Sequence, residues 1–361
     1  MKTCIYIQAQ SMFALLVLCL LPASTTAEET CQPFEDYNYV CGPQSAEDLV
    51  LVPGTKFIIA SGFANDAPFY LINSQTKTWS ELLPGLRESK HKAEPSKTCP
   101  GAPDIKKLVT HGLHIRVGEN GHSTLYVVGH GGREAIELFD VDANGSKPVL
   151  TWTDCVMTPE RLEANSVTSL KNGSILVTIP LEHGKTLGDA MAGTLTGSVY
   201  TWSPGDEHMT IVQGTELPYG NGIEISADEQ EFYVASTGLL NVIAYSNTNP
   251  AKVLRTTRTM AFVPDNLHIG QDGKLVTAGL VADYAACGTI GGDEVFSLEE
   301  FAACPRPFIV KTIDPQTMET ADIATSAAQE KFSNITMGLQ IGKELWIGTF
   351  SGDRVAYRSL Q

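Results

Sequence analysis

One short pattern occurs six times in the sequence, and this repeat limits the possible folds more than any other feature. Each copy has a strand of alternating apolar residues, a turn rich in Gly, Asn or Asp, and a second strand of β-forming residues. The copies read DLVLVPGTKFIIASG from Asp48, GLHIRVGENGHSTLYVVGH from Gly112, SVTSLKNGSILVTI from Ser166, GIEISADEQEFYVAST from Gly222, NLHIGQDGKLVTAGL from Asn266 and MGLQIGKELWIGTFS from Met337. Their spacing of roughly 45 to 70 residues is the size of a propeller blade. The repeat therefore predicts an all-β fold, a six-bladed β-propeller.

Segments between the copies supply the remaining strands. Four-stranded blades are completed by Phe69–Ile72, Ala135–Phe139, Gly197–Trp202, Asn241–Tyr245 and Phe308–Ile313. Arg354–Arg358 is expected to close the ring beside N-terminal strands, and Val281–Pro307 to form an inserted loop. Helix-like sequence occurs near Ser297–Ala303 and Ala324–Lys331. We expect one propeller domain over residues 28–361.

The first 27 residues have the features of a secretory signal peptide. Lys2 gives a weak positive start, Ser11–Leu21 is an apolar run, and small residues precede an expected cut between Ala27 and Glu28. An uncleaved N-terminal anchor is the alternative, although the run is short for a membrane span. The sequence therefore predicts a secreted protein, with no later segment apolar enough to cross a membrane.

Secretion determines how the cysteines and glycosylation sequons are interpreted. Cys4 and Cys19 leave with the signal peptide, so six cysteines remain for three disulfides, with 15 possible pairings. We expect Cys31–Cys41, Cys99–Cys155 and Cys287–Cys304, the first and last because they close local loops. Sequons at Asn144, Asn172 and Asn334 would carry glycans on exposed turns.

The chain is acidic, with a formal charge of −16. This charge argues against nucleic acid or an anionic membrane as a partner. It is compatible with simple solubility and with cation binding, and it leaves the oligomeric state open.

Polar side chains stand where the first strand of each copy begins. In a propeller these strands line the central channel, so such side chains face the axis at one end. Five of the six copies place a carboxylate, amide or imidazole there, and the sixth offers Thr336; the five sets are Glu47, His111, Asn165, Asn221, and Asp265 with Asn266. Carboxylate and amide oxygens suit Ca²⁺ better than zinc or copper. The alternative is that Asn and Asp are ordinary turn residues here.

Two histidines, His111 and His130, lie at the ends of one hairpin and could meet as a base and its orienting partner. His114, His122 and His268 have no such signal, and His183 is a weaker candidate for the channel mouth. A serine nucleophile elbow, an H-E-x-x-H motif and a phosphate-binding Gly loop are all absent from the sequence.

Together these residues resemble the paraoxonase family of calcium-dependent lactonases and arylesterases, over about Glu47 to Leu360. The resemblance is carried in order by Glu47-Asp48-Leu49, His111-Gly112-Leu113, Leu125–His130, Glu137–Phe139, Asn165, Asn221–Ile223, Asp265-Asn266 and Gly342–Gly348. It implies a channel with two calcium ions. Glu47, Asn165, Asn221, Asp265 and Asn266 match ligands of the catalytic ion. Asp48 and the Leu113 carbonyl match ligands of a buried structural ion, and His111 and His130 match the catalytic pair.

Two departures from the family pattern limit what the resemblance implies. Ser166 stands where the family has an Asp, which puts the second calcium in doubt, and Arg358-Ser359 replaces the last-strand Cys. The expected activity is hydrolysis of a small-molecule lactone or aryl ester. Calcium would bind the carbonyl oxygen, and His111, oriented by His130, would activate water. A gluconolactonase-type hydrolase of sugar lactones and a non-enzymatic calcium-binding propeller are the alternatives.

Overall fold

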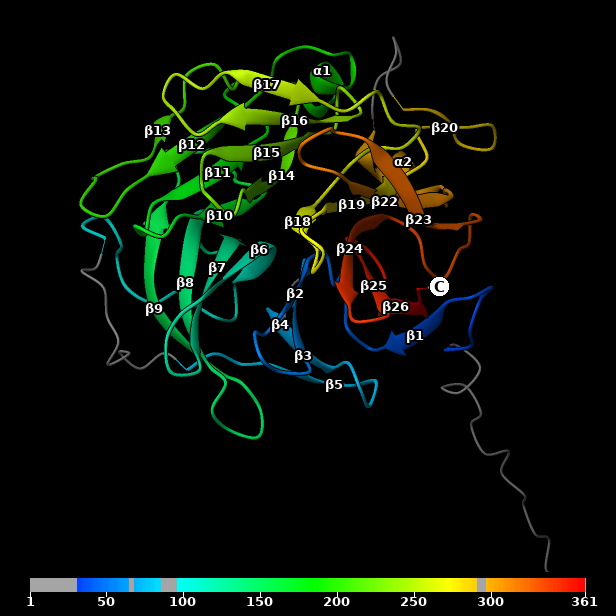
Figure 1. The fold of residues 1–361 in the computed structure, drawn as a ribbon, viewed down its shortest axis with the longest axis horizontal. Helices are drawn as coiled ribbons and strands as arrows, with labels where there is room; N and C mark the ends of the chain where they lie inside the picture. The colour runs from blue at the N-terminus through cyan, green and yellow to red at the C-terminus, as the bar shows by residue number, and fades with distance from the viewer. Residues whose placement is uncertain (1–30, 65–67, 86–95, 291–296, 361) are drawn as a thin grey trace, which may run out of the picture. The chain divides into compact units, whose positions relative to one another are not determined.

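The repeat folds into six four-stranded antiparallel sheets that surround a common axis, with the first strand of each repeat nearest the centre (Figure 1). The computed structural model describes residues 31–64, 68–85, 96–290 and 297–360. From Pro33 onward the chain forms one compact unit. The expected all-β six-bladed propeller is therefore confirmed, whereas the predicted signal peptide lies outside the described residues.

The first three blades each follow chain order from the channel outward. Blade 1 contains β2 (Leu49–Leu51), β3 (Phe57–Ser61), β4 (Phe69–Asn73) and β5 (Thr78–Glu81). Blade 2 contains β6 (Val109–Val117), β7 (His122–His130), β8 (Ala135–Asp142) and β9 (Val149–Met157). Blade 3 contains β10 (Val167–Ser169), β11 (Ile175–Ile179), β12 (Ser198–Trp202) and β13 (Thr210–Ile211).

The last three blades complete the ring, and the final blade joins the two ends of the unit. Blade 4 contains β14 (Gly220–Ile225), β15 (Glu231–Ser236), β16 (Asn241–Ser246) and β17 (Val253–Thr256). Blade 5 contains β18 (Leu267–Ile269), β19 (Leu275–Leu280), β22 (Phe308–Ile313) and β23 (Thr320–Ser326). Blade 6 contains β24 (Ile335–Ile341), β25 (Glu344–Thr349), β26 (Arg354–Ser359) and the N-terminal β1 (Asn38–Cys41). Tyr39 pairs with Ala356 in this closure, as expected.

Two short insertions interrupt the regular blades. The helix α1 (Leu187–Met191) begins at a capping box, in which Thr186 and Asp189 bond each other's backbone N–H groups. The insertion in blade 5 contains a hairpin of β20 (Asp283–Tyr284) and β21 (Gly288–Thr289), followed by α2 (Leu298–Ala303). The predicted helix near Ser297–Ala303 is thus confirmed. The one near Ala324–Lys331 is wrong, because its first residues continue β23 and pair with β22.

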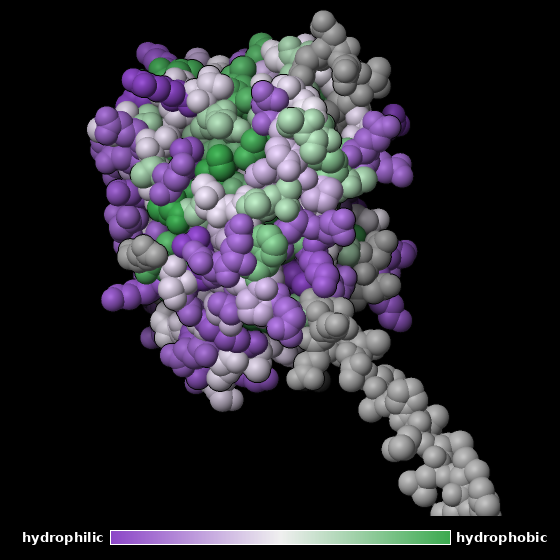
Figure 2. Space-filling view, turned by 90° about the vertical axis from the view of Figure 1, so that its right-hand side faces the viewer, coloured by the Kyte–Doolittle hydropathy of each residue, from purple (hydrophilic) through white to green (hydrophobic). Residues whose placement is uncertain are grey.

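Hydrophilic residues cover much of the flank seen in Figure 2, and hydrophobic residues gather towards its upper part. Among the described residues, no helix combines the length and apolar character needed to cross a bilayer.

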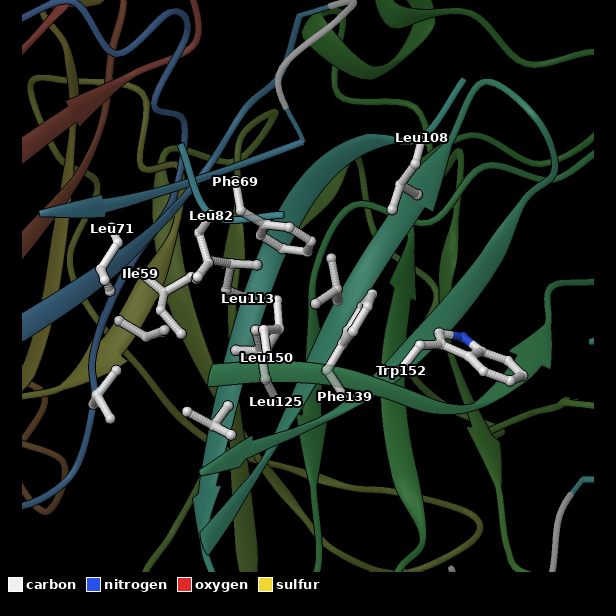
Figure 3. Close-up of a cluster of buried hydrophobic side chains, with 14 of the residues drawn as sticks. Ile59, Phe69, Leu71, Leu82, Leu108, Leu113, Leu125, Phe139, Leu150 and Trp152 are labelled. Atoms are coloured by element: carbon white, nitrogen blue, oxygen red, sulfur yellow. The ribbon is translucent and has the colours of Figure 1, made fainter. Parts of the chain in front are cut away.

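Apolar side chains between neighbouring sheets hold the blades together. Between blades 1 and 2, Ile59, Phe69 and Leu71 face Leu125 and Phe139 (Figure 3). The Phe69 and Phe139 rings meet edge to face, with their centroids 5.3 Å apart. Because each large buried side chain contributes about 1.5–3 kcal/mol, such inter-blade layers hold the inner strands in place around the channel.

The cysteines and sequons can be compared with expectation. Cys99–Cys155 and Cys287–Cys304 form the disulfides that were predicted, and Cys31 and Cys41 are also disulfide-bonded. Asn144 and Asn172 are exposed. The expectation of an exposed turn is wrong for Asn334, whose buried amide donates to Ala302 O and Ser351 Oγ.

Candidate active site at the channel mouth

Two structural devices turn polar side chains towards the axis. In blades 1, 3 and 5 these side chains stand one or two residues before the inner strand. In blades 2 and 4 the inner strand contains a register shift, between Thr110 and Leu113 and between Gly220 and Ile223, where the bulge re-aims His111 and Asn221.

Glycine permits the close approach of neighbouring inner strands at the bulges. A Cβ on Gly112 would lie 2.5 Å from Asn165 O, and one on Gly222 would lie 2.3 Å from Leu267 N. Any side chain at either position would separate the strands. The two glycines therefore allow His111 to lie beside Asn165, and Asn221 beside Asp265 and Asn266.

Within the described part of the chain, four buried oxygen atoms from four blades have no hydrogen-bond partner at this mouth. They are Glu47 Oε2, Asn165 Oδ1, Asn221 Oδ1 and Asn266 Oδ1. The amide nitrogens are engaged: Asn266 Nδ2 donates to Glu47 Oε1 at 2.5 Å, and Asn221 Nδ2 donates to Thr237 Oγ1 at 3.2 Å. Since an unpaired buried polar atom costs about 1–3 kcal/mol, this arrangement favours a cation that the oxygens could bind.

The two carboxylates of the set share one small pocket and repel each other. Burial, together with the charges of Asp48 and Asp265, raises the pKa of Glu47 well above its usual range. Burial also raises the pKa of Asp265 to about 8, although a hydrogen bond from Asn221 opposes the shift. A cation between them would relieve both effects.

The donor set of two carboxylates and three amides fits Ca²⁺, which prefers six to eight oxygen ligands. Among the described residues there is no group of three or more His, Cys, Asp or Glu side chains placed to hold a metal. The oxygens of the donor set itself, from carboxylates and amides, match a hard cation better than a soft transition metal. In blade 6, Thr336 Oγ1 donates to Glu47 O, so its hydroxyl is already used.

The expected histidine pair is present and continues into a carboxylate. His111 Nδ1 lies 3.1 Å from His130 Nε2, and His130 Nδ1 lies 2.5 Å from Glu134 Oε2. Burial, and then the neighbouring His130, lower the pKa of His111 well below its usual value. Neutral His111 presents its Nε2 to the pocket, 3.7 Å from Glu47 Oε1. The geometry forms a chain from carboxylate to imidazole to imidazole.

Glu134 and Tyr219 were missed by the sequence analysis. Glu134 follows the histidine by four residues through a Gly-Gly turn, and its role becomes visible only when that turn folds. Tyr219 has a positive φ of 51° and is held by hydrogen bonds from its N–H to Thr196 Oγ1 and from Thr237 N to its carbonyl. Its side chain hydrogen-bonds Asn165. Burial, and then Asp265, raise the pKa of Tyr219 above its usual value, so the phenol stays neutral.

Two adjoining cavities open at the mouth. The outer one, of about 1430 Å³, reaches His130, Glu134 and His183. The inner one has a volume of about 170 Å³. Its lining includes three of the four side chains with an unpaired oxygen, and the exception is Asn266. The rest of the inner wall is largely apolar, with contributions from Leu187, Met191, Val263, Leu280, Ile290, Phe301, Ile335 and Phe350. Helix α1 and the insertion of blade 5 supply part of this wall, which the repeat did not predict.

Asp48 and Leu113, which the resemblance matched to ligands of a structural calcium, do come together. The Leu113 N–H donates to Asp48 Oδ2 at 2.7 Å, and Asp48 Oδ1 accepts from Leu49 N and His268 Nε2. The carboxylate predicted for a structural calcium is thus already bonded within the protein.

Fold and site together define a six-bladed β-propeller with a polar channel mouth. Structural neighbours are gluconolactonase-like propellers. The gluconolactonase of Xanthomonas campestris aligns with TM-score 0.53 and 14% identity, over 93% of this chain and 94% of its own. The luciferin-regenerating enzyme aligns with TM-score 0.53 and 12% identity, over 89% and 93%. No protein-family model and no curated protein matches the sequence. These likenesses show the fold alone, and they give no support to the paraoxonase family in particular.

Proposed function

We propose that this protein is a secreted, calcium-dependent hydrolase of lactones or aryl esters. The observation that carries the proposal is the set of four buried, unpaired oxygens, three of which belong to side chains that line the same cavity as His111. The ion would be held by Glu47, Asn165, Asn221, Asp265 and Asn266. When bound, calcium would supply a positive charge against the negative charge that develops on the substrate carbonyl oxygen.

His111 would move the proton, and His130 and Glu134 would orient its ring. Glu134 accepts a hydrogen bond from His130 Nδ1–H, which leaves His130 Nε2 free to accept a hydrogen bond from His111 Nδ1–H. His111 Nε2 then takes a proton from water as the water oxygen bonds to the carbonyl carbon. The acyl C–O bond breaks, and the same proton passes to the leaving oxygen. The products are a hydroxy acid from a lactone, or an acid and a phenol from an aryl ester.

The inner wall favours lipophilic substrates over the sugar lactones of the gluconolactonase-type alternative. Apolar side chains such as Leu187, Ile290 and Phe350 could pack against an aliphatic or aromatic group. They offer no hydrogen bonds to sugar hydroxyls, whose burial without partners is costly.

Secretion is supported by the disulfides, because such bonds persist in oxidising compartments. We propose that residues 1–27 are removed and that the mature domain begins at Glu28. The non-enzymatic alternative shares the calcium site and differs only in activity.

The deciding experiment is hydrolysis of aliphatic lactones, aldonolactones and phenyl acetate by the purified protein, with calcium and after chelation. We expect chelator-sensitive turnover of the aliphatic lactones or phenyl acetate. Turnover of aldonolactones alone would favour the gluconolactonase-type reading. Calcium binding without any turnover would favour the non-enzymatic propeller.

A further inference from the structure

A second cluster of titratable side chains lies further along the channel from the mouth. It consists of Asp48 from blade 1, His114 from blade 2, Glu224 from blade 4 and His268 from blade 5. Each follows a mouth residue of its own blade by one to three positions in the sequence. The proposed reaction uses none of them.

An imidazole ring spans the two carboxylates of this cluster. His268 Nε2 lies 2.6 Å from Asp48 Oδ1, and His268 Nδ1 lies 3.9 Å from Glu224 Oε2. Asp48 accepts two further bonds, from Leu49 N and Leu113 N. The ring therefore joins blade 5 to blade 1 and faces blade 4.

The other groups of the cluster are also engaged within the protein. Glu224 Oε1 accepts from Ile225 N at 2.9 Å and Thr168 Oγ1 at 3.2 Å. His114 Nδ1 lies 3.4 Å from Thr168 Oγ1 and 3.7 Å from Glu224 Oε1. Ser166 Oγ accepts from Ile223 N at 3.4 Å.

This cluster contrasts with the mouth. At the mouth, four buried oxygens lack hydrogen-bond partners. No oxygen of Asp48 or Glu224 is among the buried unpaired atoms of the described residues. A calcium ion here would have to displace the hydrogen bonds of Asp48, and Ser166 offers only a hydroxyl in compensation. The residues present do not fit a second calcium ion.

We propose that His268 occupies the place of a second channel ion, and that the chain binds one calcium, at the mouth. The inference rests on the proposed calcium site and adds a positioning role for the bridge. Asp48 adjoins Glu47, and His268 follows Asn266 by two residues. The His268–Asp48 bond thus holds two ligand-bearing segments at a fixed separation.

Calcium stoichiometry tests the inference directly. Full-length secreted protein is stripped with chelator, reloaded with calcium, and its bound ions are counted by equilibrium dialysis and native mass spectrometry. One ion per chain is expected. Two ions would overturn the inference and leave the proposed function intact, whereas no ion would overturn both.

A variant designed to bind a second calcium ion makes the test sharper. In the double variant Ser166→Asp, His268→Ala, a carboxylate is added and the ring is removed, so a second ion should bind. Ser166→Asp alone should still bind one, because His268 continues to occupy Asp48. Near-native circular dichroism would establish that the variants fold, and one ion in the folded double variant would contradict the proposal.

The positioning role has its own readout, the calcium affinity of the mouth. His268→Ala should weaken it about tenfold, as supporting contacts of metal ligands commonly do. His268→Gln can still donate to Asp48 and should lose less. His122→Ala is the matched control. His122 Nδ1 lies 2.9 Å from Asp140 Oδ1, and this pair lies outside the channel. Equal affinities in all three variants would refute the positioning role.

Discussion

Removing calcium should destabilise the folded protein by an amount that can be estimated from the mouth. Four buried oxygens lack partners there, and at about 1–3 kcal/mol each they set a ceiling of roughly 4–12 kcal/mol. Water entering the ion-free site would recover part of this cost. The thermodynamics of ligand binding give a stabilisation of similar size. A ligand present at a thousand times its Kd stabilises the folded state by about 4 kcal/mol.

The assay is thermal unfolding in millimolar calcium and in excess chelator. For a chain of this length, about 2 °C per kcal/mol is expected, so chelation should lower the Tm by about 8 °C. The wild-type shift is then compared with that of Asn221→Leu, which keeps the side-chain size but removes one ligand oxygen. We expect the variant to lose at least half of the calcium-dependent shift.

Asn247→Leu is the matched control for this comparison. The Asn247 amide also donates one hydrogen bond through Nδ2, to Glu229 O at 2.8 Å, but it lies outside the mouth. It should retain the full calcium-dependent shift. An unchanged wild-type Tm on chelation, or equal shifts in all three proteins, would refute the interpretation of the unpaired oxygens as ligands.

Three further predictions concern the reaction and the ion. Glu134→Gln should lower kcat about 10–100-fold, because a neutral amide orients His130 less firmly than a carboxylate does. Calcium affinity, measured by calorimetry, should stay the same. A parallel loss of calcium binding would contradict the role of Glu134 in orienting the histidines. Calcium affinity should rise with pH up to about 8 and then stay level. The pKa of Asp265 is raised to about 8, so below pH 8 the ion must displace a proton from this carboxyl group. An affinity that does not change from pH 6 to 9 would contradict this prediction. Tyr219→Phe should weaken calcium binding about tenfold with little change in far-ultraviolet circular dichroism, because the Asn165 amide loses its hydroxyl partner; unchanged affinity would show that the hydroxyl has no role in binding.

The sequence alone determined the blades and much of the candidate site. Alternation with period two and recurring turns specify hairpins, and six of them close a ring, because strand pairing and burial act locally on each copy. Positions at the start of inner strands face the axis for the same reason. Glu47, Asn165 and Asn221 were therefore identifiable as a set before any coordinate was known.

Only the tertiary structure decided which side chains complete that set. Glu134 reaches His130 through a glycine turn, and His268 joins Asp48 across 220 residues of chain. The apolar wall comes from α1 and the blade 5 insertion, which lie outside the repeat. Such contacts join segments that share no local pattern, because they depend on the angle at which blades meet and on the folding of loops. Periodicity in the sequence carries no information about either.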